Sequence, residues 1–245
     1  MKKILLLVSC FSILSHVQAQ KDDKPAFDQS VAVKWSPASI FFGKIGLGAE
    51  YNFKRKASVT FNVGVPFEKE TTFEIDNEDR NLSTKTFSIM AGYRMYLGKK
   101  PVKGFYIEPY LKYLDNKSIT NTDFDIGLTN RPFLVTSEYS GIGIGAQLGV
   151  QFLIAKRVVI DWYLLGPEAN ISKHDLLAQE TGNGLPWTNA EAQDAEDEIN
   201  DFVNDIPLLK NNLDVTVNAA AKNVKTHYKG FLPGIRSGIS IGIRF

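Results

Sequence analysis

Hydrophobic and polar residues alternate along much of this chain. In KIGLGAEYNFK, residues 44–54, the apolar side chains from Ile45 to Phe53 share one face, while glycines, Glu50 and Asn52 occupy the other. A period of two is typical of a β-strand with one apolar face. The same alternation recurs in SVAVKW near residue 31, ASVTFNVGV (57–65), TFSIMAGYRMYL (86–97), GFYIEPYLKYL (104–114), SGIGIGAQLGVQF (140–152), VVIDWYLL (158–165) and SGISIGIRF (237–245). The pattern predicts an all-β fold of eight strands.

The polar face of these strands favours a membrane barrel over a soluble sandwich, although alternation alone fits both. This face is rich in glycine and carries charges of both signs, while the apolar face is aromatic near the strand ends. Such a contrast fits lipid outside and a crowded polar lumen inside, and a closed barrel pairs the backbone groups that lipid cannot satisfy. The charges expected in the lumen are Glu50, Arg94, Glu108, Lys112, Asp161, Arg236 and Arg244.

The connections between the strands alternate in length. Short basic links are expected at 54–56, 98–103 and 155–157, and long links at 68–84, 115–137 and 171–231. Short turns at one rim and long loops at the other are typical of outer-membrane barrels. We therefore expect an antiparallel up-and-down barrel with long extracellular loops and both termini in the periplasm.

The first residues, MKKILLLVSCFSILSHVQAQ, have the basic start, apolar stretch and small residues of a secretory signal peptide. We expect residues 1–19 to be removed and the barrel to span 20–245. A lipoprotein processed at Cys10 is the alternative, but its hydrophobic region would be very short. Cleavage after Ala19 also removes the only cysteine, so no disulfide is expected. The formal net charge of +1 for the whole chain argues against nucleic-acid binding.

On the signal peptide, the eight alternating strands, the loop rhythm and the terminal aromatic residue, the chain resembles the small eight-stranded, porin-like outer-membrane barrels of Gram-negative bacteria. These include the transmembrane domain of outer-membrane protein A and protein X. In the last strand, Ile241, Ile243 and Phe245 resemble the signal by which such barrels are recognised for assembly. The resemblance implies contact with outer-membrane lipid, lipopolysaccharide and the barrel-assembly machinery. Two departures are Pro109, which removes a ladder donor inside a strand, and WSPASIFFG (35–43), which obscures the first hairpin.

The long link 171–231 contains a helical pattern near 189–206. Thr188 and Glu191 form a capping-box pattern, after which apolar residues recur at helical spacing opposite an acidic face. Those apolar residues are Ala195, Ile199, Phe202, Val203 and Ile206. The helix is either an insertion folded over the barrel mouth with a solvated acidic face, or a surface that meets a partner. A second helix near 213–225 is weakly indicated, because Val215, Thr216 and Val217 favour a strand.

Residues with catalytic or metal-binding chemistry are few. His174 and His227 remain after signal cleavage, and Ser172, His174 and Asp175 lie too close in sequence for a catalytic triad to be inferred. Acidic clusters at 76–79 and 115–125 do not fit a calcium-binding loop, and the glycines of 141–149 continue a strand rather than form a phosphate loop. We expect no cofactor, no metal and no enzymatic activity.

The narrow lumen limits what an eight-stranded barrel can do. Its interior is just filled by side chains, so the lumen charges are expected to pair and to plug the barrel. The plug would set Glu50, Glu108 and Asp161 against the four lumen cations. The function expected is therefore structural or interactive at the cell surface. A small gated pore is one alternative, and a lipid-modifying enzyme is another.

Overall fold

The structure, a computed structural model, describes residues 29–75, 78–98, 102–126, 129–182, 185–204 and 212–245. The expected signal peptide, residues 1–19, lies outside this part of the chain. The elements are β1 (Ser30–Ser36), η2 (Pro37–Phe42), β2 (Lys44–Lys54), β3 (Ala57–Pro66), β4 (Lys69–Ile75), β5 (Glu78–Tyr96), β6 (Gly104–Ile126), β7 (Thr129–Ile154), β8 (Val158–Glu180), α2 (Asn189–Asn204), β9 (Leu213–Asn218) and β10 (Asn223–Arg244). No helix in the described ranges is long and apolar enough to cross a bilayer.

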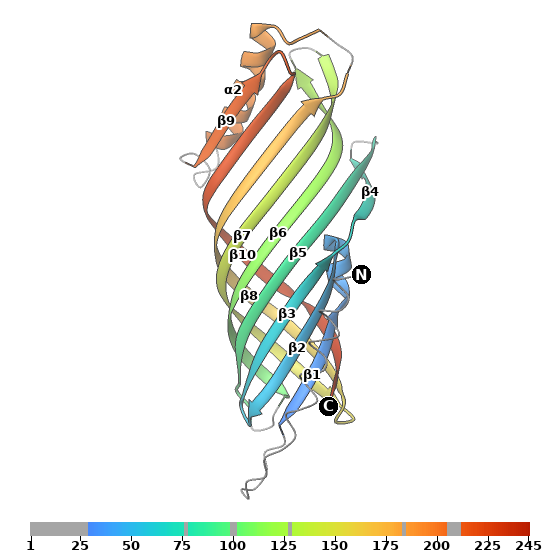
Figure 1. Cartoon of the computed structure of the whole chain (residues 1–245), viewed down its shortest axis with the longest axis vertical. Coiled ribbons are helices and arrows are strands. Elements are labelled where there is room, and N and C mark those ends of the chain that lie inside the picture. Colours follow the sequence, from blue (N-terminus) through green and yellow to red (C-terminus); the bar gives the residue numbers. More distant parts are fainter. Residues whose placement is uncertain (1–28, 76–77, 99–101, 127–128, 183–184, 205–211) are drawn as a thin grey trace, which may run out of the picture.

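Eight of the strands form a closed antiparallel ring in the order β1-β2-β3-β5-β6-β7-β8-β10 (Figure 1). The ring closes where β1 pairs with β10, from Ala32↔Arg244 to Trp35↔Ile241. The backbone of Phe245 then exchanges two hydrogen bonds with Val31, with N···O distances of 2.8 and 3.3 Å. The predicted eight-stranded barrel is confirmed, and the chain's last residue is held by its first strand.

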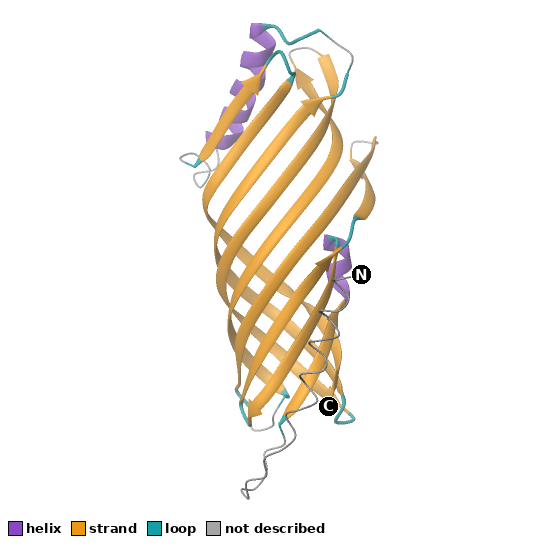
Figure 2. Cartoon of the chain, viewed as in Figure 1, coloured by secondary structure: helices purple, strands orange, loops and turns teal. Residues whose placement is uncertain are grey.

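Several strands run far beyond the segments that the sequence pattern predicted (Figure 2). The expected link 115–137 is strand on both sides, where β6 and β7 pair from Gly104↔Gln151 to Ile126↔Thr129. In the same way β8 continues to Glu180 and β10 begins at Asn223, so the expected loop 171–231 is largely sheet. The bounds expected for these two loops were therefore too wide, because the outer strand segments have polar residues on both faces and carry no alternating signal.

The outward face of the ring is apolar. Ile239, Ile241 and Ile243 of β10 are exposed, as is Phe245 just after it, and the outward apolar residues of the other ring strands are exposed or half-exposed. Exposed outward aromatic residues include Trp35, Phe61, Tyr93, Phe105, Phe152 and Trp162. An apolar surface all round a closed barrel, with the polar residues inside, is the inverse of a soluble sandwich and fits a bilayer.

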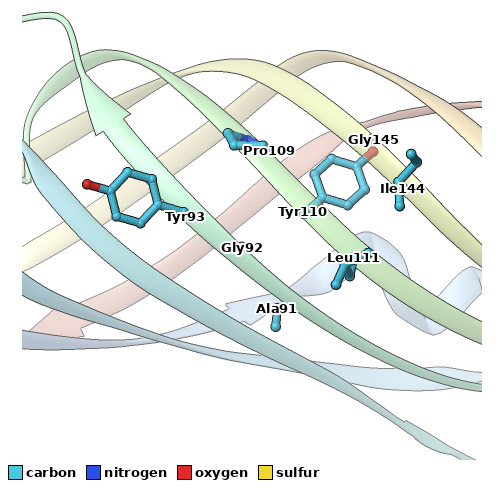
Figure 3. A pocket seen from close by; sticks show the side chains of 8 residues that line it. All are labelled: Ala91, Gly92, Tyr93, Pro109, Tyr110, Leu111, Ile144 and Gly145. Atoms are coloured by element: carbon cyan, nitrogen blue, oxygen red, sulfur yellow. The ribbon is translucent and has the colours of Figure 1, made fainter.

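Pro109 interrupts the pairing of β5 with β6. The register passes from Gly92↔Tyr110 to Met95↔Ile107 with no pairs between, although the alignment of the two strands is unchanged on either side. The donor that Pro109 lacks thus coincides with a local break in the pairing, and a depression of about 600 Å³ lies beside it in the outer face. Figure 3 shows its lining residues, which come from β5, β6 and β7.

The first hairpin contains a short 3-10 helix, η2, between β1 and β2. Pro37 stands at its start, and Gly43 ends it with a left-handed backbone (φ 64°), a conformation that glycine adopts without strain. The carbonyl of Gly43 accepts hydrogen bonds from Phe67 N (3.0 Å) and Thr86 N (3.1 Å). A Cβ at this position would collide with the carbonyl of Thr84. WSPASIFFG therefore ties the top of β2 to β3 and β5.

An apolar core lies among the long outer segments of the strands. Its buried members are Ile126, Phe133, Ala178, Trp187, Ala195 and Val224. Ala195 comes from α2, and α2 contacts β9 and β6, so the helix covers the end of the extended sheet. We call this unit the cap. The 213–225 segment contains β9 rather than a helix, as Val215 and Val217 favour.

Candidate functional site

The most buried polar groups of the protein gather in the barrel lumen. Lys34, Glu50, Arg94, Glu108 and Asp161, from five different strands, form what we call the lumen cluster. None of these five side chains is more than 6% exposed. Because side chains alternate along each strand, the same period that sends the apolar residues to the outer face brings these charges together inside.

Lys34 and Arg94 are the two cations at the centre of the cluster. Lys34 Nζ donates to Glu50 Oε2 (2.5 Å), Gln151 Oε1 (2.6 Å) and Asp161 Oδ2 (2.8 Å). Arg94 binds Glu108 Oε2 through Nε and Nη2, both at 2.6 Å, and its Nη1 lies 2.8 Å from Asp161 Oδ2. The Arg94 guanidinium also stacks on the Tyr106 ring, 3.7 Å from its centroid. Each cation therefore joins strands that are not neighbours in the ring.

Hydroxyl groups complete the coordination of the three carboxylates. Tyr96 and Ser58 donate to Glu50 Oε1 at 2.5 and 2.7 Å, and Tyr106 donates to Asp161 Oδ1 at 2.6 Å. Thr60 donates to Glu108 Oε1 at 2.5 Å, and Gln147 to Glu108 Oε2 at 3.0 Å. A buried ion network is tolerated only when its remaining lone pairs are satisfied in this way.

Glycine makes room for the cluster at one point of the wall. A Cβ on Gly92 would lie 2.5 Å from Glu108 Oε1 and 2.7 Å from Thr60 Oγ1. Only a residue without a side chain lets Glu108 lie against β5 beside Arg94. The glycine-rich polar face of the strands is thus what allows large charged side chains to fill the lumen.

The structure places the other predicted lumen charges outside the cluster. Lys112 pairs with Glu168, and Tyr110 also donates to this carboxylate at 2.9 Å. Arg236 Nε donates to Gln147 Oε1 at 3.0 Å and its guanidinium lies over the Tyr163 ring. Arg244 joins no ion pair within the described residues, and its buried Nε has no hydrogen-bond partner there. The expected pairing of all four cations with Glu50, Glu108 and Asp161 was therefore wrong for three of them.

Sequence reasoning missed Lys34 and Glu168. Lys34 stands between Val33 and Trp35 in an otherwise apolar strand, a signal that it faces inward. Glu168 was not found because the predicted strand ended at Leu165. In the structure β8 continues, and a bulge opposite Leu148 and Gly149 turns both Leu164 and Leu165 outward, which shifts the alternation by one residue.

Charged residues also gather on the outer face of the extended sheet. A groove of about 410 Å³ is lined by residues of β7, β8, β9 and β10, among them Glu138, Asp175, Asp214 and His227. His227 Nδ1 lies 2.5 Å from Asp175 Oδ1, and the pair is exposed. No group of three potential metal ligands was found among the described residues.

The lumen cluster is suited to closing the barrel rather than to chemistry. Its carboxylates are all engaged by cations and hydroxyls, and its members are almost completely buried. A residue that performs acid–base catalysis must reach a substrate, whereas these groups contact one another and the buried polar side chains around them.

Comparisons with known proteins add little to this description. No protein-family model matches the chain, and no curated protein matches it. Among solved structures, the chain is similar to the crystal structure of CarO from Acinetobacter baumannii. The two are 13% identical with a TM-score of 0.43, and the match covers 89% of this chain and 96% of that one. The fold assignment rests on the strand pairing itself, which makes this chain an eight-stranded antiparallel β-barrel.

Proposed function

We propose that this protein is an outer-membrane β-barrel of a Gram-negative bacterium, closed by the lumen cluster and working through its cell-surface cap. Its role is structural or interactive rather than enzymatic. The termini lie in the periplasm, and the barrel-assembly machinery reads Ile241, Ile243 and Phe245. The apolar outward face and the closed ring support this location, because both are what a bilayer demands of a spanning β-structure.

The burial of the lumen cluster is the observation that supports a closed lumen. Glu108 and Gln151 have no exposed surface, and Arg94 is 3% exposed. Ions crossing the lumen would have to displace charges that are held by several short hydrogen bonds at once. Breaking such a buried network by removing one partner costs about 3–5 kcal/mol. The barrel is therefore an anchor with a sealed interior.

Planar-bilayer recording tests this proposal. We expect purified wild-type protein to give no steady channels, and the Arg94→Ala/Glu108→Ala variant, which empties part of the lumen, to conduct. Arg55→Ala/Lys56→Ala, in the exposed β2–β3 turn, removes two cations and serves as the control. Steady unitary conductance from the wild type would refute the plug and support the gated pore.

The surface role is carried by the cap and the charged groove of β7–β10. The acidic helix α2 and the exposed row Glu138, Asp175 and Asp214 offer a charged surface to a partner or to divalent-bridged lipopolysaccharide, although Lys117 pairs with Glu138 and His227 with Asp175. Deleting residues 186–206 and measuring cell-surface binding, with heat-modifiable gel mobility as the folding control, separates a partner site from a merely structural insertion. Loss of barrel folding in this deletion would contradict the partner site.

A lipid-modifying enzyme is the second candidate, and one contact favours it. Ser137 Oγ lies 2.8 Å from His174 Nε2, across the β7–β8 pair. Burial lowers the pKa of His174 despite the nearby Asp175, so the imidazole is neutral at pH 7 and can accept a hydroxyl proton. Turnover of lipid by the wild type that disappears in both Ser137→Ala and His174→Ala, but not in Ser140→Ala, would establish this activity. No lipid change in any of them would exclude it.

A further inference from the structure

Strand pairing leaves the barrel wall incomplete in its outer half. Along one edge β10 pairs with β8, but along the other it pairs only with β9, over 223–228, and with β1, over 241–244. Within the described residues, 230–240 have no strand partner on that edge. On the far side of this interval, β4 pairs with β5 alone. Figure 1 shows β1, β2 and β3 ending well below β6, β7 and β8. We call the interval between the free edges of β10 and β4 the wall break.

The short helix η2 lies at the base of the wall break. It contacts β10 on one side and β2, β4 and β5 on the other. Its Phe41 and Phe42 are 75% and 63% exposed, among the most exposed large apolar side chains of the protein. The base of the wall break is therefore an exposed apolar surface.

The free edge of β10 belongs to the apolar part of the barrel. Its outward residues include Phe231, Ile235 and Ile239, all exposed. Pro233, which has no N–H to donate, lies in the same stretch, as is usual for an edge strand. The carbonyls of Gly230, Phe231 and Leu232 accept hydrogen bonds from the side chains of Ser172, Tyr228 and Asn170. In a bilayer, backbone groups of the edge that have neither a strand nor a side-chain partner are costly unless a polar group lies beside them.

Two cations without a carboxylate partner face the interior behind this edge. Lys44 Nζ donates to Ser88 Oγ at 3.0 Å, and Arg236 is bound to Gln147 and stacked on Tyr163. Neither forms an ion pair with any carboxylate in the described part of the chain. Lys44 lies within electrostatic range of Arg236, Lys112 and Glu168. Since Glu168 is already paired with Lys112, this group has an excess of two positive charges.

The excess charge lies next to the break. Arg236 is on β10 within the unpaired stretch, and a Cβ on its neighbour Gly234 would lie 3.0 Å from Glu168 Oε2. Above the apolar row of Ile171 and Phe231, two exposed lysines, Lys173 and Lys229, stand directly opposite each other. Like charges in directly opposite positions destabilise a sheet unless an anion lies between them. The excess positive charge inside the edge and the paired lysines outside it would both be stabilised by a negatively charged group.

From these observations we infer that the wall break binds a phosphorylated lipid of the surrounding outer leaflet. Its acyl chains lie over Phe41 and Phe42, and its phosphate reaches past the β10 edge to Lys44 and Arg236. The headgroup also supplies polar partners along the remainder of the free edge, beyond the three carbonyls that side chains already engage. Lipid recognition by basic residues beside a membrane surface follows the same electrostatic rule.

Lipid retention from nanodiscs tests the inference. The protein is placed in nanodiscs of phosphatidylcholine with a minor fraction of phosphatidic acid, and the lipids that remain bound are counted by native mass spectrometry. We expect phosphatidic acid to be retained over phosphatidylcholine, and the preference to fall by about tenfold in Lys44→Gln/Arg236→Gln. Neither substitution strands a buried carboxylate, so the barrel should fold. Lys156→Gln/Arg157→Gln removes two cations from the exposed β7–β8 turn and should keep the preference.

A second measurement covers the case in which the charge variant does not fold. A photocrosslinker at Ile235, on the free edge, should capture phosphatidic acid in preference to phosphatidylcholine. The same crosslinker at Ile142, which is similarly exposed but lies in fully paired wall, should show no such preference. Equal retention in all variants, or equal capture at both positions, would overturn the inference. Neither readout depends on whether the lumen conducts, so the plug can fail without affecting this result.

Discussion

At the scale of single residues, Arg94 is the cation that connects the buried charges of the lumen into one network. It contacts all three carboxylates of the lumen cluster, whereas Lys34 contacts only Glu50 and Asp161. Glu108 depends on Arg94 alone for a cation. Its other donors, Thr60 and Gln147, are neutral.

Arg94→Met should therefore destabilise the barrel strongly. The substitution keeps much of the side-chain volume but leaves Glu108 buried without a counter-charge, at a cost of about 3–5 kcal/mol. Reversible urea unfolding in liposomes measures the loss. The double variant Arg94→Met/Glu108→Gln removes the stranded charge and should recover a large part of the stability. A single variant as stable as the wild type would show that the network is not what holds the lumen.

At the scale of elements, the helix α2 is the one outer element that the sequence predicts from local rules. Thr188 and Glu191 form the expected capping box. Glu191 N donates to Thr188 Oγ1 at 3.2 Å, while Thr188 N donates to Glu191 Oε2 at 2.7 Å. The expected apolar residues Ile199, Phe202, Val203 and Ile206 have no described side chains, but Ala195 packs in the cap core. Capping chemistry is local, so one sequence suffices to find it.

Thr188→Ala should loosen α2 without affecting the ring. Losing an N-cap hydroxyl costs about 1 kcal/mol of helix stability. Hydrogen exchange should speed up in the first turns of α2 while the amides of β5–β8 stay protected. Thr188→Ser, which keeps the hydroxyl, is the matched control. If α2 amides exchange alike in both variants, the capping box is not what stabilises the helix.

What the sequence revealed at this scale depends on whether an element has an apolar outward face. Within the ring every strand has one apolar face, so alternation located all eight ring strands. Beyond it, residues such as Thr120, Asn121 and Thr122 place polar groups on both faces, and the outer half of β6 left no signal. The wall break could not be predicted for a related reason. Register and edge pairing depend on which strand lies beside which, and Pro233 was the only local hint.

At the scale of the whole molecule, the chain has two cores of opposite character stacked along one set of strands. The lumen cluster fills the ring with charge, and the cap core fills the extended sheet with apolar side chains around Trp187 and Phe133. The two share no member, although β6, β7, β8 and β10 run through both levels. We therefore expect the cap to open while the ring stays closed.

Acid should separate the two cores, because the carboxylate of Glu180 accepts several of the polar contacts within the cap. Glu180 accepts from Trp187 Nε1 (2.5 Å) and Lys222 Nζ (3.0 Å), and pairs with Arg131. Burial alone would raise the pKa of Glu180, but these hydrogen bonds hold it below its ordinary value. A carboxyl with a lowered pKa stabilises the folded state above its unfolded pKa of about 4.5, and that contribution is lost as the pH falls through the lower folded value.

The opening can be followed in a Trp35→Phe/Trp162→Phe background, in which Trp187 is the only tryptophan of the chain. Acidification below about pH 4.5 should shift the emission of Trp187 to the red, because its indole becomes exposed to water. Heat-modifiable gel mobility should meanwhile report an intact barrel. Glu180→Gln keeps an acceptor for Trp187 but has no proton to gain, so its Trp187 emission should be nearly independent of pH. If this variant opens at the same pH as its parent, other carboxylates control the cap and Glu180 is only a neighbour. If the barrel and the cap are lost together, the two cores form one cooperative unit despite their separate side chains.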